Sequence, residues 1–84
     1  MNNKVLVKLI IPEIDGEYDV FIPINLRIGT IIKLLNESLK ELNQGMFSVD
    51  DKKMLYNRDN AEPYNFNDLV RNTNIRNGSV VIFV

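Results

Sequence analysis

Apolar residues recur every three or four positions in one segment of the chain, which is the spacing of one face of an α-helix. The residues that keep this period are Ile28, Ile31, Ile32, Leu35, Leu39 and Leu42. The opposite face holds Lys33, Asn36, Glu37, Lys40 and Glu41. The pattern predicts an amphipathic helix over residues 30–42, with Thr30 as its N-cap and Gly45 just beyond its C-terminal end. Because a helix of this length is marginally stable alone, its apolar face must pack against other elements.

Strand patterns precede this helix. Residues 4–11 (KVLVKLII) are rich in β-branched side chains, and Lys8 marks the face toward solvent. Alternation therefore directs toward the helix the side chains of Val5, Val7, Leu9 and Ile11. Residues 17–22 (EYDVFI) follow an Asp-Gly turn and are predicted to return antiparallel as a hairpin. The side chains of this second strand that we expect in the core are Tyr18, Val20 and Ile22.

The chain after the helix is less regular. We expect a third strand within residues 51–57, with Met54 facing the core. Residues 61–73 fit no long period, and we expect them to hold one very short strand and a single helical turn at residues 67–70.

The chain closes on its most apolar segment. Residues 76–78 (RNG) are a strong turn signal that requires positive φ at Gly78, and residues 79–84 (SVVIFV) follow as a strand. Val81 and Phe83 are predicted to point inward. A strand without polar alternation is typical of one that is covered on both faces, or of one whose outer face is a binding surface.

The order of these elements predicts an α+β fold. The helix forms a crossover between an antiparallel hairpin and later strands, so it lies across one face of a mixed sheet of four or five strands. The last strand is expected at the centre, beside the first strand and parallel to it, because exposed edges are a liability. This arrangement is the β-grasp roll, and we expect it to fill residues 1–84 as a single domain.

Six apolar residues remain at positions that alternation directs to the open face of the sheet. These residues are Leu6, Ile10, Phe21, Leu55, Val80 and Ile82. Scattered apolar residues are normal on protein surfaces, and Lys stems or loops can cover them. If neighbouring strands gather these side chains together, they form a patch large enough to bind another protein. We therefore predict that they form a protein-binding patch.

Composition excludes most catalytic chemistry. The chain has no cysteine and no histidine, so disulfides, thiolate nucleophiles, imidazole acid/base catalysis and most zinc or iron sites are absent. It also lacks a glycine-rich phosphate loop. We interpret Asp50, Asp51, Asp59 and Glu62 as solvated loop acids, with a cation site as the alternative. We expect no enzyme activity, no cofactor and no metal.

Charge and hydropathy limit the partners. The net charge of −1 gives no basic surface for nucleic acid. The longest apolar run, residues 80–84, is much shorter than a membrane span, and the N-terminal segment lacks the pattern of a signal peptide. We therefore expect a cytoplasmic protein that binds protein, without nucleic acid and without direct membrane insertion.

Two segments carry a resemblance to a known family. Residues 16–39 (GEYDVFIPINLRIGTIIKLLNESL) and the closing pattern I-x-N-G-S-V-V-x-F at residues 75–83 resemble the ubiquitin-like EsaB/YukD family of bacterial type VII secretion systems. The resemblance implies a small, cytoplasmic, non-catalytic adaptor with an accessory or regulatory role in secretion of WXG-motif substrates. It also implies docking on a cytoplasmic part of a secretion membrane component.

Two other functions remain open at this point. A ubiquitin-like modifier or sulfur carrier needs a flexible C-terminal Gly-Gly, whereas this sequence ends on Phe83 and Val84, so we expect no conjugation. A homodimeric regulator would instead use the same apolar sheet face to bind a second copy of the chain.

Overall fold

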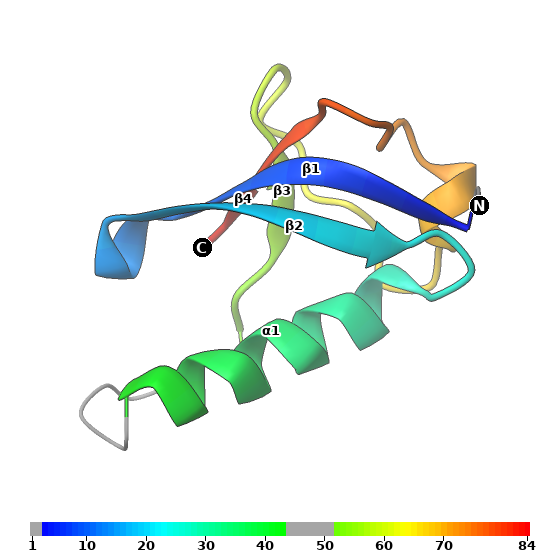
Figure 1. The fold of residues 1–84 in the computed structure, drawn as a ribbon. Coiled ribbons are helices and arrows are strands. Elements are labelled where there is room, and N and C mark those ends of the chain that lie inside the picture. Colours follow the sequence, from blue (N-terminus) through cyan, green and yellow to red (C-terminus); the bar gives the residue numbers. More distant parts are fainter. Residues whose placement is uncertain (1–2, 44–51) are drawn as a thin grey trace.

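The computed structural model describes residues 3–43 and 52–84 (Figure 1). The elements of this part of the chain are β1 (Lys4–Ile11), a 3-10 helix η1 (Pro12–Ile14), β2 (Gly16–Pro23), α1 (Ile28–Asn43), β3 (Leu55–Asn57), a second 3-10 helix η2 (Val70–Asn72) and β4 (Val80–Phe83). The α-helix lies across one face of the sheet, as Figure 1 shows. The predicted α+β roll, a mixed sheet with one helix across it, is confirmed.

Within the described residues the sheet has four strands in the order β2-β1-β4-β3. The strand β1 pairs antiparallel with β2 and parallel with β4, and β3 pairs antiparallel with β4. A parallel pair requires a long crossover, which α1 and the segments around it supply. The predicted position of the last strand, central and parallel to the first, is therefore confirmed.

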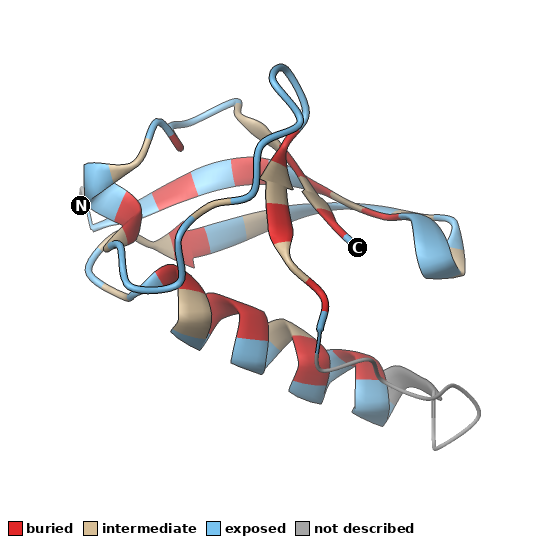
Figure 2. Ribbon diagram, turned by 180° about the vertical axis from the view of Figure 1, so that it is seen from behind, coloured by how far each residue is buried: buried red, intermediate tan, exposed pale blue. Residues whose placement is uncertain are grey.

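The core lies between α1 and the sheet face that α1 covers, which we call the inner face (Figure 2). The strand β1 alternates regularly, and its inward residues Val5, Val7, Leu9 and Ile11 are all buried, as predicted. Val81 and Phe83 of β4 are completely buried. The helix adds Ile28, Ile31, Ile32 and Leu39, with Leu35 half-buried. Each buried aliphatic or aromatic side chain contributes about 1.5–3 kcal/mol before the loss of conformational entropy is subtracted.

The predicted hairpin forms through η1. Asp15 adopts the left-handed region with φ of 51°, and its N–H donates to the Pro12 carbonyl oxygen over 3.0 Å. Aspartate tolerates this conformation better than most residues, which is why the turn closes directly before Gly16.

The start of the helix differs from the prediction. The helix begins at Ile28, and the N–H of Thr30 donates to the Arg27 carbonyl oxygen, so Thr30 lies inside the first turn and is not the N-cap. The amides of Ile28 and Gly29 instead donate to carbonyl oxygens of a later segment, those of Asp68 (2.9 Å) and Phe66 (3.0 Å). A distant part of the chain thus satisfies the free N–H groups, and no side-chain cap is needed. The predicted packing of the Leu42 side chain and the predicted cap at Gly45 lie outside what the structure describes.

Four predicted side-chain positions are wrong, and three of them belong to the predicted strands. Leu55 is 0% exposed and packs in the core, so it does not lie on the open face of the sheet. Its neighbour Met54 is only half-buried. The pairing of Leu55 with the buried Phe83 fixes the orientation of β3, and three residues of strand were too few for alternation to reveal it. Tyr18 is 41% exposed, because its ring lies against Gly16 at the start of β2, at the margin of the core.

The segment between β3 and β4 is more irregular than predicted. It contains isolated bridges at Leu69 and Pro63 in place of a strand, and η2 at Val70–Asn72 in place of a turn at residues 67–70. The N–H of Val70 donates to the Leu26 carbonyl oxygen over 2.9 Å, which ties this segment to the connection between β2 and α1. Asn36, predicted to face solvent, is buried beside this segment, near Phe66.

Candidate protein-binding face

The side of the sheet away from α1, which we call the outer face, is built by strand register. Leu6 of β1 lies opposite Phe21 of β2, and Ile10 of β1 lies beside Ile82 of β4. Tyr56 of β3 lies beyond Ile82 in the same row. The outer face consists of Lys4, Leu6, Lys8, Ile10, Glu17, Asp19, Phe21, Pro23, Tyr56, Val80 and Ile82.

Apolar side chains form two groups on the outer face. The first group is the pair Leu6 and Phe21, which are 41% and 67% exposed. The second group spans three strands with the half-buried side chains of Ile10, Val80, Ile82 and Tyr56. Five of the six predicted patch residues are therefore on this face, and Leu55 is the exception. Tyr56, which the sequence pattern did not indicate, takes the place of Leu55. The reason is that the side chains of β3 alternate in the sense opposite to the predicted one.

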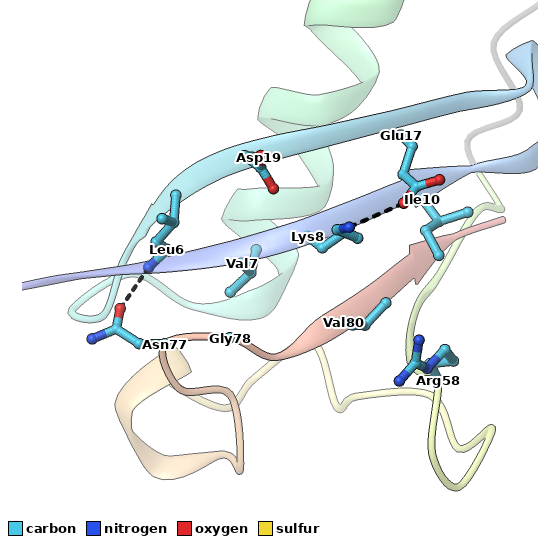
Figure 3. Close-up of a pocket in the computed structure, with 10 residues that line it drawn as sticks. All are labelled: Leu6, Val7, Lys8, Ile10, Glu17, Asp19, Arg58, Asn77, Gly78 and Val80. Atoms are coloured by element: carbon cyan, nitrogen blue, oxygen red, sulfur yellow. Dashed lines mark hydrogen bonds and ion pairs between the residues drawn. The ribbon is translucent and has the colours of Figure 1, made fainter.

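A charged row separates the two groups. Lys8 lies between Asp19 of β2 and Val80 of β4, and its ammonium group forms an ion pair with Glu17 over 3.2 Å. Figure 3 shows this pair beside an open depression of about 670 Å³ between the hairpin and β4. Arg58 lies at the β3 end of the depression, where its N–H donates to the Val80 carbonyl oxygen over 3.2 Å.

The turn before β4 forms one rim of this depression. The side-chain oxygen of Asn77 accepts a hydrogen bond of 2.8 Å from the N–H of Leu6, and the N–H of Gly78 donates to the Leu6 carbonyl oxygen over 2.9 Å (Figure 3). Gly78 has a φ of 88°, which confirms the predicted conformation. The turn is thus fastened to β1, and it holds the outer face in a fixed shape around Leu6.

A polar cluster that the sequence did not reveal lies behind β3. The amide of Asn57 donates to the Tyr64 hydroxyl over 2.9 Å, and that hydroxyl donates to the side-chain oxygen of Asn74 over 2.6 Å. Burial raises the pKa of the Tyr64 hydroxyl, the hydrogen bond from Asn57 opposes this shift, and the charge of Asp59 reinforces it. These bonds join the end of β3 to two points of the irregular segment that follows it, 7 and 17 residues further along the chain, so the cluster shapes that segment.

A second unpredicted interaction joins η1 to the chain before β3. The ammonium group of Lys53 is buried, pairs with the carboxylate of Glu13 and lies 5.7 Å from the centre of the Phe83 ring. Lysine is rarely buried without such a partner. This pair lies on the inner side of the molecule and belongs to its packing.

The part of the chain that the structure describes offers neither a cluster of metal-binding side chains nor a membrane-spanning helix. Residues 3–43 and 52–84 contain no group of three or more acidic, histidine or cysteine side chains that could hold a metal ion. Asp59 is instead 3.6 Å from the Arg58 guanidinium, and Asp50 and Asp51 lie outside the described residues. In the same part of the chain, no helix has the length and apolar character needed to cross a bilayer.

The arrangement of the elements defines a ubiquitin-like β-grasp fold. It combines an N-terminal hairpin, a crossover helix and a C-terminal strand that lies at the centre of the sheet, parallel to the first strand. Solved structures of ubiquitin-like proteins support this assignment, whereas the sequence matches no protein-family model and no curated protein. The ubiquitin-like domain of the type VII secretion protein EccD1 from Mycobacterium tuberculosis aligns with a TM-score of 0.70 and 13% identity, over 96% of this chain and 97% of that domain.

Two further structures are similar. A chain of the MycP5-free ESX-5 inner membrane complex aligns with a TM-score of 0.70 and 17% identity, over 98% of this chain and 21% of that one. A structure reported as "Molecular Mimicry of SUMO promotes DNA repair" contains a chain that aligns with a TM-score of 0.76 and 18% identity, over 100% of this chain and 94% of that one. At these identities the similarity establishes the fold.

Proposed function

We propose that this chain is a non-catalytic ubiquitin-like adaptor that binds a protein partner through the outer face. The observation that carries the proposal is the exposure of Leu6 and Phe21 directly opposite each other, beside the half-buried apolar group at Ile10, Val80 and Ile82. These side chains come from three different strands and converge on one surface.

Binding energetics favour such a surface. Covering an apolar side chain contributes about 1.5–3 kcal/mol, and the central, fully desolvated residues of an interface carry most of the affinity. The ion pair of Lys8 and Glu17, with Asp19 beside it, divides the apolar groups and offers polar contacts that fix the orientation of the partner. The fixed turn at Gly78 reduces the conformational freedom that the outer face loses on binding.

The partner that we propose is a cytoplasmic part of a type VII secretion membrane component. Two observations support this assignment. The segment at residues 16–39 resembles the EsaB/YukD family, and the fold is shared with ubiquitin-like domains of secretion proteins. We accordingly propose a cytoplasmic location and an accessory or regulatory role in secretion. A homodimer that uses the same face is the alternative.

The test is co-purification from the source cell, with Leu6 and Leu34 as matched sites. Both leucines are nearly half exposed, but Leu6 lies on the outer face and Leu34 lies on α1. Affinity-tagged wild type, Leu6→Gln and Leu34→Gln are each purified from detergent-solubilised membranes, and the bound proteins are identified by mass spectrometry. We expect a secretion membrane component with wild type and Leu34→Gln, and its loss with Leu6→Gln.

Two results would contradict the proposal. Equal recovery of the membrane component with Leu6→Gln would move the binding site away from the outer face. Recovery of a second, untagged copy of the chain in its place, with sedimentation that shows a dimer at micromolar concentration, would favour the homodimeric regulator.

A further inference from the structure

One edge of the sheet is open within the described residues. The edge at β3 is covered, because the N–H of Asn57 donates to the Glu62 carbonyl oxygen (3.2 Å) and the N–H of Tyr64 donates to the Leu55 carbonyl oxygen (2.9 Å). The other edge is β2, and no described strand pairs with its outer side. Figure 1 shows β2 as the strand along that border, with α1 beneath it.

The backbone of β2 has free hydrogen-bonding groups along this edge. The N–H of Ile24 donates to the Asn3 carbonyl oxygen over 2.9 Å, and the register of β2 on β1 is uniform. Even-numbered residues of β2 therefore bond to β1, and the N–H and C=O groups of Glu17, Asp19 and Phe21 point away from the sheet. Pro23 has no N–H, so the usable edge ends there.

An apolar groove runs along the same edge, between β2 and α1. It consists of two adjoining depressions of about 130 and 260 Å³, which share Leu9, Val20, Leu35 and Ser38. Leu34 lines one end of the groove and Tyr18 lines the other. Both side chains are nearly half exposed, although they border the core.

The charges along the groove have one sign. Asp19 borders the groove from β2 with its side chain on the outer face, and helix geometry places Glu41, three residues after Ser38, on the same side of α1. Lys33 and Lys40 instead line a separate depression on another side of the helix, with Asn36 and Phe66. The rim of the groove is therefore acidic and its interior is apolar.

We propose that the edge of β2 binds an extended peptide segment of a partner protein, which adds a strand to the sheet. Free backbone groups at Glu17, Asp19 and Phe21 supply main-chain hydrogen bonds. Alternate side chains of the added strand enter the groove, so they are aliphatic and β-branched, and the flanking residues are basic because the rim is acidic. This site is separate from the outer face and takes a different partner from the membrane component, so neither proposal depends on the other and Leu34→Gln remains a control for the outer face.

The probe is a displayed library of random short peptides, selected on the full chain. We expect the enriched sequences to share an alternating run of Val or Ile with Lys or Arg at its ends. The best such peptide is then synthesised and titrated into the isotopically labelled chain, and amide hydrogen exchange is followed by nuclear magnetic resonance. Slower exchange is expected at Asp19 and Phe21, because their N–H groups become hydrogen-bonded in the complex.

Variants on α1 locate the site. Leu34→Gln should weaken binding of the peptide about tenfold, whereas Lys33→Gln, its neighbour outside the groove, should leave the affinity unchanged. Leu6→Gln on the outer face should also leave it unchanged, which separates this result from the test of the outer face. A peptide methylated on its alternate backbone nitrogens should lose binding if those N–H groups pair with β2.

Four results would overturn the proposal. In the selection, they are enrichment of helical or acidic peptides and failure to enrich any extended sequence. In the exchange experiment, they are protection of the amides of Leu6 and Val80 in place of Asp19 and Phe21, and concentration-dependent protection of the β2 edge without peptide. The last result would assign the edge to a second copy of the chain.

Discussion

The two faces of the sheet carry similar side chains in different surroundings. On the inner face, Val7, Leu9 and Val81 are buried against α1 without an intervening charge. On the outer face, Leu6 and Ile10 are separated by Lys8, which is paired with Glu17. The comparison shows that apolar character alone does not identify the core. The faces differ because α1 covers the inner face, whereas the outer face carries charged side chains that remain in contact with solvent.

The largest expected difference between the faces is at β3, where adjacent residues point to opposite sides. Leu55→Lys would bury an ammonium group without a partner, so we expect the domain to unfold or to lose most of its stability. Tyr56→Lys places the same charge on the half-exposed outer face and should cost less than about 1 kcal/mol. Urea denaturation measures both variants. Equal unfolding midpoints would contradict the assigned orientation of β3, and a lower midpoint for Tyr56→Lys would show that it is reversed.

An intermediate effect is expected at the rim of the outer face. Gly78 has a φ of 88° and open space where a side chain would lie, so Gly78→Ala should cost about 1–2 kcal/mol through backbone strain alone. Gly78→Asn should cost less, because asparagine visits the left-handed region more readily. Thermal unfolding of the two variants checks this, and a fully stable Gly78→Ala would contradict the backbone explanation.

The smallest effect concerns the polar cluster, which belongs to neither face. Below about pH 10, Tyr64 is protonated in both the folded and the unfolded chain and adds no pH dependence. Its folded pKa is raised by burial, so above that pH the unfolded chain releases the proton first and stability falls as pH rises. Urea midpoints at about pH 8 and about pH 11 should fall less for Tyr64→Phe than for wild type. An equal fall would place the cause at another group.

The sequence predicted the long elements and missed the contacts between distant ones. The strand β1 has eight residues, and its alternation determined the inward set correctly. The strand β3 has three residues, and its orientation depends on the pairing of Leu55 with Phe83, which no local pattern contains. The helix start at Ile28 likewise depends on carbonyl groups some forty residues later.

The candidate site was predictable to the same extent. Leu6, Ile10 and Phe21 were correctly placed because they lie on long strands with regular alternation. Tyr56 was missed and Leu55 was misplaced because β3 is too short for its alternation to show which face each side chain takes. The free edge of β2 and its acidic groove could not be predicted, because they require the strand order and the position of α1.

The central claim is that the inner face stabilises the fold and the outer face binds the partner. The most direct test measures the thermal stability of wild type, Leu6→Gln and Leu34→Gln, together with their affinities for the purified membrane component by calorimetric titration. We predict nearly equal melting temperatures for all three proteins, and binding weakened about tenfold by Leu6→Gln alone. A Leu6→Gln protein that melts like wild type and binds the partner equally well would contradict the claim.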